Sequence, residues 1–363
     1  MRNRSMDMMK GIAILLVVFL HSGPVPFDGV LWDWLGQGTY RLAMFLFVSG
    51  YLFKDMQWAD YKDFFIRKSK HLALPLIGWN IVYAVIATIL VMNTKLEFIP
   101  PVKEIWSLHN LFIEPFLTGN QYILNLATWF IGSLYLALLF YGCLSIITAK
   151  IPRWVMLVVY FGLAVLSLYL TQLPFTSHWI LAGLKLMIFP FFLHLGYCYR
   201  HYCEPHMTSW LNWTILFASL ILLRVTWNYG GHTFGLAWMS FEDQLLLPLL
   251  VAIFGTVMWK QICDIWVAHT EPGLIEKAFG QYSFSIMTHH LLIRLAVCAV
   301  GVYVLSDAVT TQQFYKSIWF VPRNVDFWTL TFFELTLCIL WQRGFDFLCN
   351  KIKTKIPLTP NRL

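Results

Sequence analysis

The sequence has little charge and lacks the patterns of a secreted, metal-binding or nucleic-acid-binding protein. Only 12% of its 363 residues are charged, about half of the roughly 25% usual in globular domains, whereas 58% are hydrophobic. The seven cysteines lie outside the expected outer loops and form no Cys-x-x-Cys pair, which argues against a disulfide framework and a structural zinc site. The histidines of the presumed outer loops show no His-x-x-x-His spacing, and no nucleic-acid-binding motif occurs, so we expect neither a metal nor a nucleic-acid partner.

Further absences bear on domain organisation. The sequence has no internal repeat and no low-complexity linker, so we expect residues 1–363 to form a single transmembrane domain with no fused soluble module. The first apolar run is not followed by a small-residue cleavage site, so we expect the N-terminus to stay attached. The sequence leaves open whether copies of the chain associate into a homo-oligomer.

What the sequence does have is a series of long apolar segments. A run of about 20 apolar residues is long enough to cross a bilayer as an α-helix. We therefore expect an all-α integral membrane protein of the cell membrane, in contact with membrane lipid, with about ten transmembrane helices. These are expected near Lys10–Ser22, Leu35–Phe53, Leu72–Met92, Leu126–Ile147, Trp154–Leu170, Ile180–Tyr199, Leu211–Trp227, Gln244–Trp259, Tyr282–Leu305 and Phe327–Cys349.

The distribution of Lys and Arg between these segments predicts their orientation. One set of loops and the two ends of the chain carry most of the basic residues. The opposite loops hold only Lys95, Lys103, Lys316 and Arg323. Because cytoplasmic loops are enriched in Lys and Arg, both termini are expected to be cytoplasmic. The net charge of +7 follows from this inside-positive pattern.

The first apolar segment carries ionisable residues at both ends. Asp7 and Lys10 lie at its start, and His21 lies at its end. On an α-helix, Lys10 and His21 are about 16 Å apart along the axis and point to nearly the same face. One interpretation is that Asp7 and Lys10 mark the cytoplasmic start of the helix and that His21 is an interface residue. The other is functional, because ionisable groups within membranes are functional candidates by default.

Other polar residues within the segments are further candidates. Arg41 interrupts the second segment near the outer side, so we expect it to line a wet cavity or to meet a partner. Ser49 and Gly50 in the same segment favour close helix packing. Glu334, in the last segment, is expected to be protonated or to lie against a cation. Its candidate partners are Arg41, Arg224, Arg294 and Arg343.

A basic cluster lies between the second and third segments. Arg67, Lys68 and Lys70 come just before Leu72 in the expected cytoplasmic loop. Such a cluster is typical of a topology signal or of contact with lipid headgroups. It also suits a phosphorylated cytoplasmic ligand, because Lys and Arg bind phosphate.

Five motifs occur in order along the chain: Asp7-Met8-Met9-Lys10-Gly11 with His21, FLFVSGYLF (Phe45–Phe53), FFIRKSKHLALP (Phe64–Pro75), WFIGSLYL (Trp129–Leu136) and FGQYSFSIMTHH (Phe279–His290). With FPFFLHLGYCYR (Phe189–Arg200), they make the chain resemble the membrane-bound acyltransferase 3 family over most of its length. Lys10 stands where many members have arginine, and His289 and His290 are alternatives for the family's later histidine. The sequence SGYLF favours the branch of this family that resembles polysaccharide and fucose O-acetylases.

This resemblance implies a membrane-bound O-acyltransferase, by default an acetyltransferase. It would move the acyl group of cytoplasmic acyl-CoA to a hydroxyl of a cell-surface glycan or of its lipid-linked precursor. The pantetheine arm would run along the first helix toward His21, the general base, since histidine accepts protons near neutral pH. The other residues of the implied catalytic motif are Asp7 and Lys10. The CoA nucleotide would be held by Lys10, Arg67, Lys68 and Lys70.

Four residues are candidates for binding the substrates: Arg41, Trp129, His290 and Glu334. Trp129 is alternatively a core aromatic, and His290 a helix-end histidine. Direct attack and a covalent acyl-histidine are both open. The main alternative function is a multi-span secondary transporter or polysaccharide exporter, in which the buried charges would form a path. A sensor or scaffold without turnover is a third.

Overall fold

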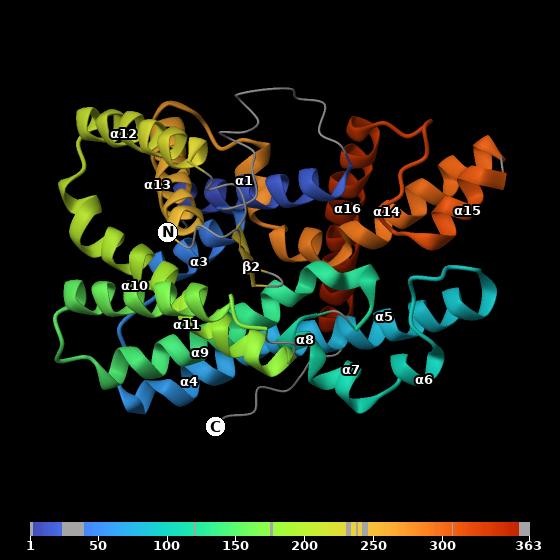
Figure 1. Ribbon diagram of the computed structural model, residues 1–363, viewed down its shortest axis with the longest axis horizontal. Coiled ribbons are helices and arrows are strands. Elements are labelled where there is room, and N and C mark those ends of the chain that lie inside the picture. The colour runs from blue at the N-terminus through green and yellow to red at the C-terminus, as the bar shows by residue number, and fades with distance from the viewer. Residues whose placement is uncertain are drawn as a thin grey trace.

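The structure is a computed structural model that describes residues 3–23, 40–119, 121–174, 177–229, 234–236, 239–241, 246–306 and 308–355. Within these residues the chain is helical apart from its turns and one antiparallel pair of two-residue strands, β1 (Phe234–Gly235) and β2 (Ser240–Phe241). Figure 1 shows the helices packed into one bundle, many of them running roughly along its long axis. The expected all-α architecture is therefore confirmed.

Each of the ten predicted segments contains a helix. These helices are α1 (Arg4–His21), α3 (Arg41–Tyr51), α5 (Leu74–Asn93), α9 (Trp129–Ile147), α10 (Arg153–Leu170), α11 (His178–Cys198), α12 (Ser209–Asn228), α13 (Leu246–His269), α14 (Ser283–Leu305) and α16 (Phe327–Lys355). α13 continues past its predicted end at Trp259, because Lys260 pairs with Asp264 one turn later and the polar pair stays within the helix. Residues 35–39 and 244–245 of the predicted segments lie outside the described residues.

Among the residues that the structure describes, seven helical stretches are long and apolar enough to cross a membrane. They are Trp58–Asn93, Ile123–Ile147, Arg153–Leu170, His178–His206, Ser209–Thr226, Leu246–His269 and Ser283–Leu305. By contrast, α1 contains Arg4, Asp7 and Lys10, and α3 has only 11 residues. These findings support a multi-pass membrane protein, while ten crossings and cytoplasmic termini stay predictions.

Shorter elements connect the long helices. α4 (Trp58–Lys68) and the π-helical turn η1 (Ser69–Ala73) lead into α5. The others are α6 (Val102–Ile105), α7 (Leu108–Phe112), α8 (Glu114–Leu117), η2 (Ile123–Thr128), η3 (Tyr199–Cys203), η4 (Glu204–His206), η5 (Ile275–Gly280) and α15 (Ala308–Lys316).

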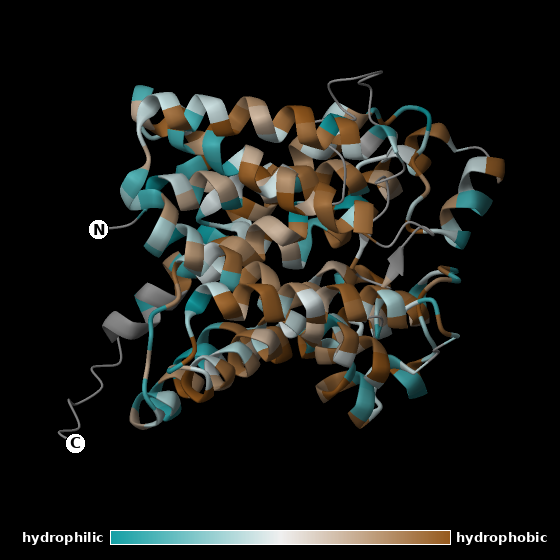
Figure 2. Ribbon diagram, turned by 60° about the vertical axis from the view of Figure 1, so that its left-hand side comes forward, coloured by the Kyte–Doolittle hydropathy of each residue, from teal (hydrophilic) through white to brown (hydrophobic). Residues whose placement is uncertain are grey.

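The bundle carries apolar residues on its outside as well as in its core. α10 and α12 expose large apolar side chains such as Val158, Phe217 and Ile221. Figure 2 shows hydrophobic residues along the middle of the helices and hydrophilic residues gathered toward helix ends and loops. This distribution is expected of helices whose outer faces contact lipid, because lipid tails do not penalise apolar exposure.

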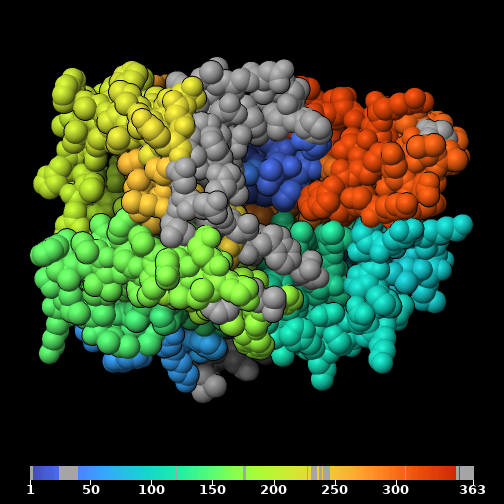
Figure 3. All heavy atoms as spheres, viewed as in Figure 1, coloured from blue at the N-terminus to red at the C-terminus, as the bar shows by residue number. Residues whose placement is uncertain are grey.

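α1 packs against α3, α13, α14 and η5. Two glycines allow the close approach of η5. A Cβ atom on Gly11 would strike the backbone carbonyl of Ile275, and one on Gly280 would strike that of Asp7. Figure 3 shows part of α1, in blue, at the surface beside the orange C-terminal elements.

α3 and α11 approach each other closely. A Cβ atom on Gly50 would collide with the backbone of Leu193, and one on Gly196 would collide with the carbonyl of Phe47. The packing role predicted for the Ser49-Gly50 pair is therefore confirmed at Gly50.

Candidate active site

His21 and His290 meet although 269 residues separate them in the sequence. His21 is the last residue of α1, and His290 lies on α14. The Nδ1 atom of His21 is 2.8 Å from the Nε2 atom of His290. The two rings stack, with their centroids 5.0 Å apart and an interplanar angle of 12°. Two candidates from distant motifs thus form one pair.

The hydrogen-bond network assigns the tautomers of this pair. Nδ1 of His290 lies 2.8 Å from the carbonyl oxygen of Ile286, which only accepts hydrogen bonds, so this nitrogen carries the hydrogen. In a neutral ring, Nε2 of His290 is then the acceptor, and Nδ1 of His21 donates to it. The remaining nitrogen of His21, Nε2, keeps its lone pair and has no hydrogen-bond partner among the described residues.

Arg294 holds the end of α1 in place. Its Nη1 atom donates to the carbonyl oxygen of His21, Nη2 to that of Trp319 at 2.9 Å, and Nε to that of Ile318 at 3.1 Å. The ring of Trp319 lies 5.3 Å from the ring of His21, between centroids. The imidazole of His21 is therefore packed between His290 and Trp319 rather than turned out toward lipid.

Glu334 contacts the residue that follows His21. It is fully buried, and its Oε2 atom lies 2.8 Å from the hydroxyl oxygen of Ser22, which also lies 2.9 Å from the carbonyl oxygen of Val18. Its Oε1 atom has no hydrogen-bond partner in the described part of the chain. Arg294, one of the four arginines considered from the sequence, donates to backbone carbonyl oxygens and forms no ion pair with Glu334 among the described residues. Sequence reasoning did not identify Ser22 as a site residue. Its position next to His21 could have suggested it.

Arg41 reaches the same end of α1. It is buried, and its Nη1 atom donates to the carbonyl oxygen of Leu16 at 2.7 Å. The expectation that Arg41 has a partner is confirmed, and the partner is a backbone carbonyl rather than a carboxylate.

The other end of α1 holds Asp7 and Lys10. Their side chains form an ion pair of 2.8 Å. Both line a cavity of about 340 Å³ together with Tyr51 and Arg200. Arg200 donates to the carbonyl oxygen of Tyr51 at 3.0 Å, which holds its guanidinium at this cavity. Arg200 ends one of the sequence motifs, but sequence reasoning gave it no role in the site.

A second cavity of about 470 Å³ contains two residues of the basic cluster. Arg67 and Lys68 line it, with Lys54, whereas Lys70 is exposed and does not line it. Leu52 lines both this cavity and the one at Lys10, so the two adjoin. The structure thus brings together Lys10, Arg67 and Lys68 at the end of α1 opposite His21.

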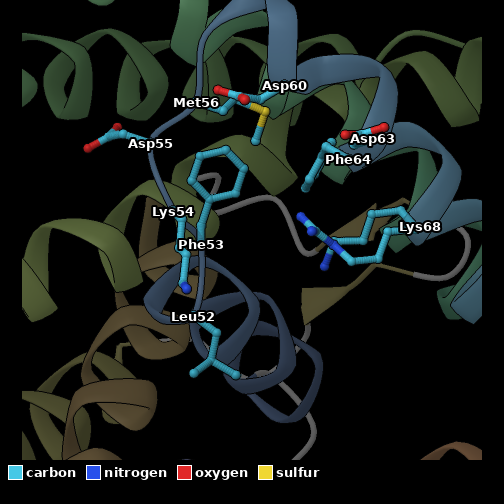
Figure 4. Close-up of a pocket in the computed structure, with 10 residues that line it drawn as sticks. Leu52, Phe53, Lys54, Asp55, Met56, Asp60, Asp63, Phe64 and Lys68 are labelled. Carbon is cyan, nitrogen blue, oxygen red and sulfur yellow. The ribbon is translucent and has the colours of Figure 1, made fainter.

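Carboxylates also line the second cavity, and two of them have partners of their own. Asp55 pairs with Arg153 at 2.9 Å. Figure 4 shows its carboxylate pointing away from Lys68. Asp60 accepts a hydrogen bond from the backbone nitrogen of Gln57 at 3.1 Å, as part of the helix cap of α4. The charge of Asp55 is therefore offset outside the cavity.

Trp129 lies apart from the histidine pair. Its contacts among the described residues include Phe130 and the ammonium of Lys185, whose Nζ atom is 4.3 Å from the ring centroid. Lys185 also donates to the carbonyl oxygen of Leu117 at 3.1 Å. The structure therefore groups His290, Arg41 and Glu334 around the end of α1 and places Trp129 in a buried cation–π contact.

Comparison with known proteins identifies the family. A family model described as acyltransferase domain matches residues 3–301, most of the chain. No curated protein and no solved structure matches the chain. The family match supports a transferase and disfavours the transporter alternative. On this evidence, the chain belongs to the membrane acyltransferase 3 family.

Proposed function

We propose that this protein transfers an acyl group, acetyl by default, from cytoplasmic acyl-CoA to a hydroxyl of a cell-surface glycan or of its lipid-linked precursor. The observation that carries the proposal is the bond between His21 and His290, which leaves Nε2 of His21 as a base. A neutral alcohol is a poor nucleophile and needs such a base. Membership of an acyltransferase family supports the reaction class.

In the proposed reaction, the acceptor hydroxyl gives its proton to Nε2 of His21 as its oxygen attacks the thioester carbonyl carbon. The new C–O bond forms, the C–S bond breaks, and the CoA thiolate takes the proton back from the imidazolium. A positioned base of this kind is typically worth about 10²–10⁴ in rate. His290 positions the base by fixing its tautomer, and Arg294 holds the backbone at His21.

The donor is proposed to bind at the opposite end of α1. The phosphates of CoA carry negative charge, which matches Lys10, Arg67 and Lys68 around the two adjoining cavities. Lys54 and Arg200 add two further cations. His21 does not line either cavity, so passage of the pantetheine arm over about 16 Å is part of the proposal.

The remaining predicted residues take different places in this proposal. Arg41 and Glu334 flank the end of α1 at which the acceptor would be acylated. Trp129 is assigned to packing instead of contact with the reacting atoms, because the ammonium of Lys185 lies over its ring. Lys70 is left out of the proposed donor site, since it lines neither cavity.

The proposal is tested with the purified protein in nanodiscs, [14C]acetyl-CoA and glycan extracted from a strain that lacks the protein. We expect base-labile label in the glycan and a rise in Tm on adding CoA. No label in the glycan and no stabilisation by CoA would contradict the proposal. After rapid denaturation in detergent at neutral pH, label on the protein indicates an acyl-histidine intermediate, and an unlabelled protein indicates direct transfer.

A further inference from the structure

A polar cavity of about 490 Å³ lies beyond the C-terminal end of α5, outside the site described above. It is formed by residues 97–101, by Glu104, His109, Asn110 and Glu114 from the short helices α6 to α8, and by Gln121, Ile123 and His178. Figure 3 shows the segment that carries most of these residues, cyan to turquoise, at the right-hand end of the lower half. Its volume falls in the range of small-ligand sites, roughly 300–1,000 Å³.

One buried acceptor of this cavity lacks a donor. Gln121 is 3% exposed, and its Oε1 atom has no hydrogen-bond partner in the described part of the chain. Its orientation is fixed by Asn80, which donates from Nδ2 to the carbonyl oxygens of Asn110 and Leu111, both at 2.9 Å. Asn80 Oδ1 must therefore accept from Nε2 of Gln121, at 2.6 Å, so Oε1 is the free end. A buried acceptor without a donor is costly, so the site favours a ligand that donates.

Glu114 positions two histidines at the wall of the same cavity. Its carboxylate accepts from Nε2 of His109 at 2.9 Å, from Nδ1 of His178 at 3.1 Å, and from the hydroxyl of Thr118. Both imidazoles remain about half exposed, and their other ring nitrogens have no partner among the described residues. A neutral imidazole that donates from one ring nitrogen accepts at the other, so the second nitrogen of each histidine is an acceptor.

The rest of the lining favours a neutral ligand rich in hydroxyl groups. Glu97 and Glu104 add exposed carboxylates, and neither Lys95 nor Lys103 of the same segment lines the cavity. An anionic ligand would be repelled by these carboxylates. No group of described residues was found that could hold a metal ion. The apolar part of the wall, which includes Phe98 and prolines, suits the C–H face of a sugar ring.

Elements around this cavity pack against α14, which carries part of the candidate active site. The turn η2, which follows Gln121, packs against α14, the helix that carries His290. Tyr83, on the same helix as Asn80, donates to the carbonyl oxygen of Thr288 at 3.0 Å. The cavity therefore borders elements that position the histidine pair.

We propose that this cavity binds a neutral sugar unit of the acceptor glycan and so selects the glycan that is acylated. The assignment of the glycan as acceptor rests on the proposed function. The free acceptors at Gln121, His109 and His178 receive the hydroxyl hydrogens of the sugar, and the apolar wall packs against its ring.

The first test needs no acyl transfer. His109 and His178 in the full-length protein are modified with diethyl pyrocarbonate, with and without glycan extracted from a strain that lacks the protein. We expect the glycan to slow modification of both histidines at least fivefold in the wild type and in the neighbouring control K103A. In Q121L, protection should be lost, while CoA still raises Tm and so reports folding. Equal modification rates with and without glycan in the wild type would overturn the proposal.

The second test measures transfer and separates this proposal from the proposed function. E104A removes an exposed carboxylate that can accept a sugar hydroxyl at the cavity wall, so we expect the KM for the glycan to rise at least threefold, with K103A unchanged. Unchanged KM values in both E104A and Q121L overturn the sugar site while leaving the acyltransferase intact. Protected histidines without any transfer in the wild type support the sugar site and contradict the proposed function.

Discussion

The Nδ1 atom of His21 and the Nε2 atom of His290 lie 2.8 Å apart, and the carbonyl of Ile286 accepts from the far nitrogen of His290. This chain of two bonds fixes the hydrogen of His21 on Nδ1 and leaves Nε2 free to act as a base. His290 is thus a positioning residue, whose effect is exerted through the tautomer of His21.

We expect H290A to lower kcat for acyl transfer by roughly tenfold to a hundredfold, because His21 then loses the acceptor that selects its tautomer. H290Q should recover part of the lost rate, since a glutamine amide oxygen can accept from Nδ1. The measurement is kcat and KM for acyl-CoA in both variants. Equal losses in H290A and H290Q, with Tm lowered equally, would indicate a purely structural role.

The cations that line the two cavities proposed to bind acyl-CoA should affect the KM for acyl-CoA more than kcat. Replacing Arg67 or Lys68 by alanine is expected to raise the KM for acyl-CoA about tenfold, because a hydrogen bond to a charged group is worth about 1.5–3 kcal/mol. The effect should shrink at high salt as charges are screened. K70A is the matched control, since Lys70 is exposed and does not line the cavity. A larger KM effect in K70A than in R67A or K68A would contradict this donor site.

Ser22 should stabilise the protein through Glu334. S22A removes the hydrogen-bond partner of Oε2 in a fully buried carboxyl, so we expect a loss of about 1–3 kcal/mol in the free energy of unfolding. S49A is the control, because among the described residues the hydroxyl of Ser49 bonds only to the carbonyl of Phe45, one turn earlier in its own helix. The measurement is the Tm of each variant in detergent, and S22A should melt below S49A.

Gly50 should tolerate no side chain. Its added Cβ atom would collide with the backbone of Leu193, so G50A must push α3 and α11 apart and is expected to reduce folded yield and Tm sharply. G78A is the control on another helix, where nothing lies within 4 Å of the added atom, and it should be neutral or slightly stabilising. A G50A protein as stable as G78A would show that the contact of α3 with α11 is looser than described.

The sequence predicts the helices well because length and apolarity alone decide which segments suit a membrane. It misplaces the end of α13, since Lys260 resembles a segment end until its pairing with Asp264 is seen. His21 and His290 could be nominated by motif, whereas their hydrogen bond depends on how α1 and α14 pack. The contact between Ser22 and Glu334 and the free oxygen of Gln121 depend on residues that are far apart in the sequence. Residue spacing therefore could not predict them.

The central claim is that His21 removes the proton of the acceptor hydroxyl. Its most direct test compares acyl transfer by wild type and H21A in nanodiscs, with equal protein yield and equal stabilisation by CoA verified first. The account predicts that H21A binds CoA normally and transfers label at least a hundredfold more slowly, with no recovery at higher acyl-CoA concentration. Transfer by H21A at the wild-type rate would contradict the account.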